Sequence, residues 1–366
     1  MEDVEVSIVG GGLAGLYAAS LLEQRNISYH LFDTKPVFGG RIAGIPSAMS
    51  NTQFFDLGPT WVFSHHKSMQ KLVQQNGLTL FPQYTTGDVL YQFENIKEPR
   101  RISSPPSSIP HRISGGIYAL ICSMVNKLNS QSLHAAHCVN SIKKIGGQWQ
   151  LLITHRNPEG KRIEEQISSK YVFLAMPPRI IARDFSREKW MSQALLSQLN
   201  HSQTWMSAQA KLIITYPSPF WRERGLSGQA FSQVGPLVEV HDASCSDAEG
   251  FALFGFIGIP ATQRIREIPK ELKQACIKQL AAIFGQDAYR FEKCYLKDWA
   301  KDLDVCTGHD QSEGARHPQI SIGEAKHTLG EQGIYFTGSE FANTGAGYLE
   351  GAIVAVDEAI TAFENR

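Results

Sequence analysis

Of two glycine-rich stretches at opposite ends of the chain, the first contains residues whose spacing suits phosphate binding. Near the start, Gly10, Gly12 and Gly15 form a GxGxxG pattern within GGGLAG. Such glycines permit a tight turn, let the backbone approach a pyrophosphate, and expose the N–H groups of a following helix to the anion. Asp33 follows about 20 residues later, where a carboxylate accepts hydrogen bonds from ribose hydroxyls. Together these residues predict a dinucleotide site.

The elements around the first stretch support this prediction. The β-branched run VEVSIV precedes the glycines, LYAASLLEQRN has helical apolar spacing, and ISYHLFD is typical of a second strand. This order is a βαβ unit. Arg41 follows Gly39 and Gly40, and its guanidinium suits bidentate contact with the same phosphates.

The second stretch, TGSEFANTGAGYLEG, lies near the end of the chain. It follows the apolar strand GIYFTG and runs into a closing helix, so the first domain is expected to draw on both ends of the chain. The middle segment has its own strands (KLIITY, GQAFSQV, PLVEV, FALFGFI) and the amphipathic helix PKELKQACIKQLAAIFG.

The predicted fold class is therefore α/β, with a discontinuous Rossmann-like nucleotide-binding domain and a second, mixed α+β substrate domain that contains an antiparallel sheet. We assign residues 1–80, 112–200 and 300–366 to the first domain and residues 81–111 and 201–299 to the second. Three strands between residues 138 and 167 are expected to form an antiparallel meander, and YVFLAMPP a separate strand.

Composition excludes several classes of function. The 366 residues include 35 Lys plus Arg and 35 Asp plus Glu, so no net field favours nucleic acid or an anionic membrane. No apolar run reaches the roughly 20 residues of a membrane span. The six cysteines are scattered without a CxxC pair, which favours reduced thiols and a cytoplasmic location. His65 and His66 are adjacent and would diverge, so we predict no metal site.

The order of motifs resembles that of the flavin-containing amine oxidase family, which includes monoamine, polyamine and L-amino-acid oxidases. The resemblance rests on GGGLAG, Asp33, GGRI, DLGPTW, FLAMPP and GIYFTGSE…GYLEGAIVA, and it spans the whole chain. It implies a two-domain fold with FAD, held non-covalently, in the discontinuous domain.

The resemblance also implies roles for single residues. Lys211 would hold a water against the flavin and assist reoxidation by oxygen, Trp299 would pack beside the flavin ring, and Tyr348 would form a wall of the substrate site. Val139 would hold the adenine, and the backbone N–H of Leu349 would meet the pyrimidine carbonyl. The full cofactor-binding prediction is Gly10, Gly12, Leu13, Ala14, Gly15, Asp33, Thr34, Gly40, Arg41, Gly58, Pro59, Thr60, Val139, Trp299, Gly338, Ser339, Glu340, Gly347, Tyr348 and Leu349.

The implied reaction is oxidation of a small amine or amino acid to an imine, with hydride transfer to the flavin and oxygen as acceptor, giving hydrogen peroxide. Two further reactions stay open: a renalase-like oxidation of isomeric dihydronicotinamides, and action on a biosynthetic or protein-bound intermediate. Arg222 and Arg224, with Lys211, are candidates for binding a substrate carboxylate, although exposed loop arginines are the commoner case.

The chain departs from the family pattern in two places. The family usually has a long helical insert over the substrate site, but here only residues 81–112 are available, so the site is expected to be open or covered by a second copy or partner chain. No tyrosine follows Trp299 to form an aromatic cage with Tyr348. His309 is a candidate replacement, and Cys306 lies near the position of covalent flavin attachment in some members, but both are expected to be ordinary loop residues.

Overall fold

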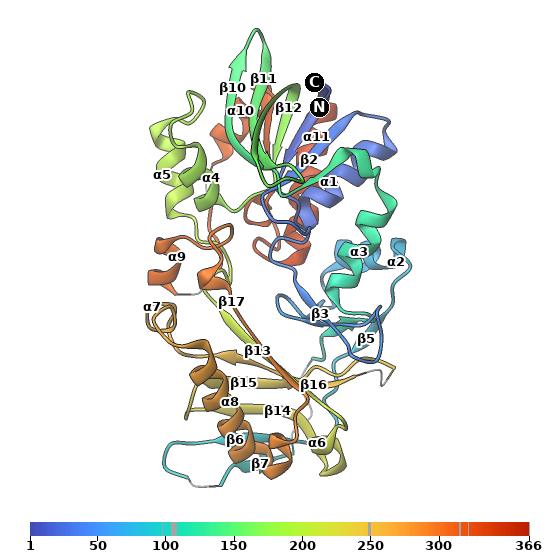
Figure 1. Ribbon diagram of the computed structural model, residues 1–366, viewed down its shortest axis with the longest axis vertical. Helices are drawn as coiled ribbons and strands as arrows, with labels where there is room; N and C mark the ends of the chain where they lie inside the picture. Colours follow the sequence, from blue (N-terminus) through green and yellow to red (C-terminus); the bar gives the residue numbers. More distant parts are fainter. Residues whose placement is uncertain (97, 104–107, 248–249, 315, 321, 366) are drawn as a thin grey trace.

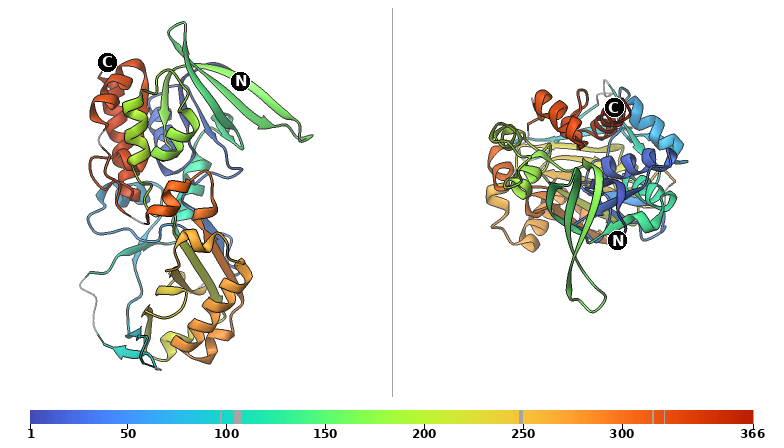
Figure 2. Two further views of the ribbon diagram at one scale, coloured as in Figure 1. Left: turned by 90° about the vertical axis from the view of Figure 1, so that its left-hand side faces the viewer. Right: turned by 90° about the horizontal axis from the view of Figure 1, so that it is seen from above.

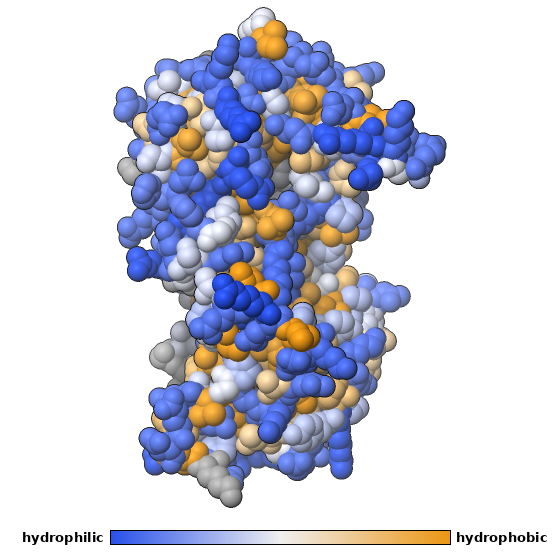
Figure 3. Space-filling model, turned by 60° about the vertical axis from the view of Figure 1, so that its left-hand side comes forward, coloured by the Kyte–Doolittle hydropathy of each residue, from blue (hydrophilic) through white to orange (hydrophobic). Residues whose placement is uncertain are grey.

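The protein is divided into two halves, each organised around a seven-stranded sheet. A computed structural model describes residues 1–96, 98–103, 108–247, 250–314, 316–320 and 322–365. Figure 1 shows both chain termini in the upper half, and Figure 3 shows a narrower waist between the two halves.

The upper sheet combines the parallel βαβ strands with an antiparallel extension. Its strand order is β10-β11-β12-β1-β2-β9, and β18 pairs with β12. The strands are β1 (Val4–Val9), β2 (Tyr29–Asp33), β9 (Leu133–Ala135), β10 (Cys138–Ile145), β11 (Gln148–Arg156), β12 (Arg162–Leu174) and β18 (Ile334–Phe336). The predicted βαβ unit is confirmed. Strand β1 precedes helix α1 (Leu13–Gln24) in the chain, β2 follows it, and the two strands pair in parallel.

The prediction of a separate strand at YVFLAMPP is wrong, because this segment continues the last strand of the meander. The first part of β12 pairs antiparallel with β11, while Ser169 to Leu174 pair in parallel with β1. No glycine or proline interrupts the sequence from Arg162 to Leu174, so nothing turns the chain between the two partners. The long strands β10 to β12 project from the body in Figure 2.

Helices cover both faces of the upper sheet. One apolar layer includes Val6, Leu16, Leu120 and Ile353, from β1 and helices α1, α3 and α11. The other includes Trp149, Leu174 and Phe185. The helices of this half are α2 (Lys67–Gln75), α3 (Ile117–Lys127), α4 (Pro178–Phe185), α5 (Gln193–His201), α9 (Gly308–Glu313), α10 (Gly323–Gln332) and α11 (Leu349–Glu364), with 3₁₀ turns η1 (Ser130–Ser132), η3 (Trp299–Lys301) and η4 (Ser339–Phe341).

The lower sheet has the order β17-β13-β16-β15-β14-β6-β7. Its strands are β6 (Asp88–Gln92), β7 (Arg100–Ile102), β13 (Ala210–Tyr216), β14 (Leu226–Ser232), β15 (Leu237–Asp242), β16 (Phe251–Ile257) and β17 (Lys293–Asp298). Helix α8 (Pro269–Phe284) packs its apolar stripe on one face, and the short elements α6 (Phe220–Glu223), α7 (Ala261–Arg264) and η2 (Gln286–Tyr289) lie beside it.

Two small two-stranded antiparallel sheets lie between the two large sheets. They are β3 (Gly44–Pro46) with β4 (Phe54–Asp56), and β5 (Leu80–Pro82) with β8 (His111–Ile113). In the described part of residues 81–112 there are strands but no helix, in agreement with the expected loss of a helical cover. The Ser/Pro-rich connection predicted at residues 102–112 includes 104–107, which lie outside the described residues. The domain boundaries that we assigned from the sequence stay a prediction.

A contact between distant segments caps helix α2. The carboxylate of Glu350, in the first turn of α11, accepts the backbone N–H groups of Ser68 (3.0 Å) and Met69 (2.8 Å). A carboxylate at a helix N-terminus satisfies donors that the helix itself leaves free. Glu350 therefore links the glycine-rich stretch near the C-terminus to helix α2, which follows the first glycine loop and Arg41 in the chain. Among the helices of the described residues, none is long and apolar enough to cross a membrane.

Candidate active site

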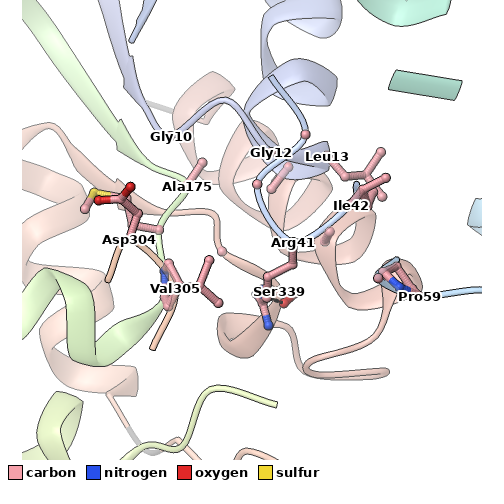
Figure 4. Close-up of a pocket in the computed structure, with 18 of the residues that line it drawn as sticks. Gly10, Gly12, Leu13, Arg41, Ile42, Pro59, Ala175, Asp304, Val305 and Ser339 are labelled. Atoms are coloured by element: carbon pink, nitrogen blue, oxygen red, sulfur yellow. Dashed lines mark hydrogen bonds between the residues drawn. The ribbon is translucent and has the colours of Figure 1, made fainter. Parts of the chain in front are cut away.

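A cavity of about 420 Å³ lies where the ends of the upper strands face the lower sheet. It is lined by the glycine loop after β1, the ends of β2 and β12, the segment after β4, and parts of β13, β16, η3, η4 and α11. The volume falls in the range of small-molecule and cofactor pockets, about 300–1,000 Å³. Figure 4 shows the glycine loop, Arg41 and Ser339 around this space, with Asp304 and Val305 approaching from another segment.

The three glycines of the GxGxxG motif have different roles in the structure. Gly10 has a φ of 109°, and a Cβ there would lie 2.5 Å from the carbonyl oxygen of Ala175. A Cβ on Gly15 would overlap the carbonyl oxygen of Gly10, so Gly15 allows helix α1 to pack closely against the loop, and it does not line the cavity. Gly12 is the N-cap of α1, and a Cβ there would meet no atom nearer than 3.7 Å. A methyl group at Gly12 would therefore make only ordinary contacts with Gly39 and Gly40, and Gly12 itself lines the cavity.

The carboxylate of Asp33 is held at the end of β2 beside this loop. It accepts the backbone N–H of Gly11 at 2.6 Å and that of Lys35 at 2.8 Å. Burial raises the pKa of Asp33, and these two hydrogen bonds oppose the rise. Thr34 and Val139, which were predicted to bind the cofactor, line the cavity together with Asp304, which sequence analysis did not identify. Their contact with the cofactor stays a prediction.

Arg41 already has a buried anionic partner. Its guanidinium forms a bidentate ion pair with Glu340, at 2.6 and 2.9 Å, and also donates to Oγ of Ser339 at 2.9 Å. Glu340 is fully buried and does not line the cavity, whereas Arg41 and Ser339 do. The Arg41–Glu340 ion pair joins the loop after β2 to η4 near the chain end. It therefore holds both glycine-rich stretches next to the same cavity.

The start of helix α11 forms the opposite end of the cavity. Its N-cap, Tyr348, makes no side-chain capping bond, and Gly347, Tyr348 and Leu349 all line the cavity. Helix α1 likewise begins without a side-chain cap. Two helix N-termini, each with free N–H groups and a positive dipole end, therefore open into the same space.

Lys211 is buried in the cavity wall on strand β13. Only 2% of the residue is exposed. Its ammonium donates to the carbonyl oxygen of Gly58 at 3.0 Å and to Oγ1 of Thr60 at 2.5 Å, and it lies 4.2 Å from the ring centroid of Phe254. Burial lowers the pKa of Lys211, while the charge of nearby Asp56 raises it. The side chain is thus fixed beside the cavity and is not a solvated lysine at a sheet edge.

Trp299 forms another part of the wall at the start of η3. It is 6% exposed, and its indole N–H donates to the carbonyl oxygen of Leu57 at 3.1 Å. This bond ties the end of the lower sheet to the segment that also carries Gly58 and Thr60. The remaining predicted residues that line the cavity are Leu13, Ala14, Gly40, Pro59 and Gly338.

Several candidates outside the predicted cofactor set lie elsewhere. His309 is exposed on α9 and Cys306 is 1% exposed, and neither lines the cavity. Arg222 pairs with Asp242 and Arg224 with Asp287, and neither reaches the lining. The constellation of Lys211 with two arginines, predicted as a candidate carboxylate site, is therefore not assembled.

Sequence analysis missed an aromatic group beside Tyr348. Trp205, Phe63, Trp61 and Phe256 all line the cavity. Met206, next to Trp205, has a φ of 57°, a left-handed conformation that is uncommon outside glycine. Trp61 ends the DLGPTW motif, but no local motif marks Trp205, Phe63 or Phe256, which reach the cavity through packing.

Comparisons with known proteins agree with this arrangement. The family described as NAD(P)-binding Rossmann-like domain matches residues 8–75, and that described as flavin containing amine oxidoreductase matches residues 106–359. A probable flavin-containing monoamine oxidase A from Dictyostelium discoideum is 24% identical over 442 aligned positions, covering 95% of each protein.

Solved structures show the same fold. A putrescine oxidase bound to putrescine matches with a TM-score of 0.79 at 18% identity, covering 100% of this chain and 99% of that one. Cyclohexylamine oxidase from Brevibacterium oxydans IH-35A matches with a TM-score of 0.78 at 16% identity, covering 99% of each chain.

The cavity itself fits a dinucleotide cofactor. The side-chain-free backbone at Gly12 and the uncapped start of helix α1 suit a pyrophosphate. The part-buried carboxylate of Asp33 suits a ribose, and the uncapped start of helix α11 suits an electron-accepting ring. The chain belongs to the flavin-containing amine oxidoreductase family and is an FAD-dependent, amine oxidase-type enzyme.

Proposed function

We propose that the chain oxidises a small amine to an imine and that oxygen reoxidises the cofactor, giving hydrogen peroxide. One observation carries the proposal: a buried lysine, Lys211, is anchored in an otherwise aromatic wall of the cofactor cavity. A fixed cation in a water-poor site stabilises negative charge that develops next to it. Lys211 is well placed to favour transfer of electrons to oxygen.

The residues of the chain would position the reacting partners. FAD, when bound, supplies the two-electron oxidation of the carbon next to the amine nitrogen. Trp299, Tyr348 and Phe256 form apolar walls that exclude water and orient the amine. Non-covalent binding of FAD is supported by the position of Cys306, which is buried outside the cavity lining.

An amine is better supported than an amino acid. An amino acid needs a cation for its carboxylate, but Arg222 and Arg224 are paired with Asp242 and Asp287 away from the lining. Oxidation of isomeric dihydronicotinamides and action on a partner-held intermediate receive no support from a contact among the described residues. A cover supplied by a second copy or partner chain stays a prediction.

Anaerobic mixing tests the proposal directly. The purified holoenzyme is mixed with a panel of monoamines, diamines and L-amino acids, and the flavin absorbance is followed. We expect amines to bleach the oxidised spectrum and air to restore it with release of peroxide. If no amine reduces the flavin, the proposed reaction is wrong. If air does not restore the colour, oxygen is not the acceptor, and if air restores the colour without peroxide, the proposed product is wrong.

A row of side chains in the lower sheet places a carboxylate on the same face as Lys211. Strand pairing places Lys211 opposite Phe256, Phe256 opposite Glu239, and Glu239 opposite Phe231, so these four residues share one face. Glu239 thus lies two strand spacings, about 10 Å, from Lys211. Its carboxylate accepts from Nε2 of His241 at 2.5 Å and is part exposed. We propose that Glu239, which lies on the same sheet face as Lys211 but outside the residues that line the cavity, binds the distal ammonium of a diamine that extends along this face. Diamines are the class to which the putrescine of the matched structure belongs.

We expect Glu239→Gln to lower kcat/KM for an α,ω-diamine by about 10–100-fold, because a hydrogen bond to a charged group is lost. The value for an alkyl monoamine of the same length should change less than about threefold. Glu271→Gln, which removes a carboxylate from the outer helix α8, is the matched control. Equal losses for the diamine and the monoamine would assign Glu239 a purely structural role.

The glycines of the first motif give a second prediction. Gly15→Ala should destabilise the protein by roughly 1–3 kcal/mol, because the added methyl overlaps the carbonyl of Gly10. Gly12→Ala should leave apoprotein stability within about 0.5 kcal/mol but lower FAD content, because its methyl fills cavity space. Thermal unfolding of apoprotein and bound FAD per chain measure the two effects. An unchanged Tm for Gly15→Ala would contradict the packing argument.

A further inference from the structure

His317 contacts two walls of the cavity from outside. Its imidazole stacks on the ring of Trp205, with centroids 3.7 Å apart and planes 17° apart. Its Nε2 lies 3.1 Å from the hydroxyl oxygen of Tyr348, within hydrogen-bond distance. Trp205 and Tyr348 line the cavity, whereas His317 is exposed. The imidazole therefore lies at the boundary between the cavity and solvent.

The backbone holds this histidine close to its partners. A Cβ on Gly347 would lie 2.6 Å from Cβ of Trp205 and 3.1 Å from Cδ of Pro318. Only glycine at position 347, with its φ of 82°, lets the three segments meet this closely. The left-handed backbone conformation of Met206, next to Trp205, is a second source of backbone strain near Gly347. Backbone strain that persists beside the cofactor cavity favours a functional reason for the close packing of His317 on Trp205 and Tyr348.

We propose that His317 is a titratable part of the substrate entrance, and that its protonation weakens the binding of cationic amines to the aromatic walls formed by Trp205 and Tyr348. This inference rests on the proposed amine substrate. Aromatic faces attract ammonium groups, but a positive imidazolium stacked on one of those faces opposes the attraction. Histidine side chains ordinarily change charge between about pH 5 and 8. The entrance would thus accept cations better at neutral than at acidic pH.

Other charged or titratable groups also surround the entrance. They are His65 and His66 before α2, Arg41 after β2, Glu350 in α11, and Arg316 beside His317 in the chain. Burial lowers the pKa of His66. Arginines keep their charge throughout. Exposed His65, which stacks on Phe63 at 5.7 Å, is the histidine that serves as a matched control.

The test measures binding without turnover. Benzyltrimethylammonium is a cation that cannot form an imine, so its affinity for the oxidised holoenzyme can be measured by calorimetry at pH 5.5 and pH 8.0. We expect the wild type to bind about tenfold more weakly at the lower pH. His317→Phe retains a stacking ring without a charge, and its affinities at the two pH values should differ several-fold less than those of the wild type. Lys211 in the cavity wall also gains its charge in this range and accounts for any remaining difference.

The control variant removes a nearby histidine without touching Tyr348 or Trp205. His65→Phe should keep the tenfold pH dependence, and both variants should keep wild-type FAD content. The proposal is overturned if the wild type shows no pH dependence, if His317→Phe keeps it, or if no binding is measured at pH 8.0. Because the probe is not oxidised, these outcomes are separate from failure of the anaerobic amine panel.

Discussion

Replacing Lys211 by methionine is expected to slow reoxidation of the reduced enzyme by oxygen by about 10²–10³-fold. The ammonium is fixed by Gly58 and Thr60 in the cavity wall, and methionine has a similar length without the charge. FAD content should stay near that of the wild type, because Lys211 belongs to the lower sheet and not to the glycine loops. Stopped-flow mixing of the reduced enzyme with oxygen gives the rate.

The pH dependence of the same rate follows from the buried position of Lys211. Burial, opposed by the charge of Asp56, lowers the pKa of Lys211 to about 7. The protonated lysine is therefore present below this pH and lost above it, so reoxidation by the wild type should slow as the pH rises through about 7. Lys211→Met should lack this step.

Lys293→Met is the matched control for charge removal. Lys293 lies on the adjacent strand β17, opposite Thr215, and is exposed outside the cavity lining. Its reoxidation rate should equal that of the wild type. An unchanged rate in Lys211→Met would remove this lysine from the oxygen reaction while leaving the oxidation of amines untouched.

Replacing Arg179 by methionine is expected to destabilise the protein by about 3–5 kcal/mol, because it leaves a buried carboxylate without its partner. Arg179 is 2% exposed and donates to Asn200, to Asp310 at 2.8 Å and to Glu313 at 2.5 Å. It joins α4 to the segment containing α9, and that segment also carries Asp304 and Val305 of the cavity lining. Thermal unfolding should show a Tm lower by several degrees, and less FAD should be retained.

Two further variants separate the ion pair from general damage. Arg183→Met, one helical turn away, removes an exposed pair with Asp184 and should cost no more than about 1 kcal/mol. Adding Asp310→Asn to Arg179→Met should restore part of the lost stability, because the unpaired buried charge is gone. A loss no larger than that of Arg183→Met would show that the buried pair contributes little.

Much of the nucleotide site was predictable, because the backbone conformations that it needs depend on residue types at neighbouring positions in the sequence. Gly10 needs its positive φ and Gly15 its missing Cβ, and both demands place glycine in a recognisable spacing. The strand–glycine–helix order was likewise confirmed by β1 and α1. The single long strand β12 was not predicted, because a strand that exchanges one partner for another needs no turn residue to mark the change.

The sequence by itself determined the α/β class, the glycine loops at both ends, and the motif order that identifies the family. Only the tertiary structure decided which side chains meet: Arg41 with Glu340, Glu350 with the start of α2, and His317 with Tyr348. The physical reason is that a turn or helix start depends on residues a few positions apart, whereas these contacts depend on how distant segments pack. Residue type alone does not fix such partners. His317 contacts Tyr348, whereas His309 lies on helix α9 outside the cavity lining.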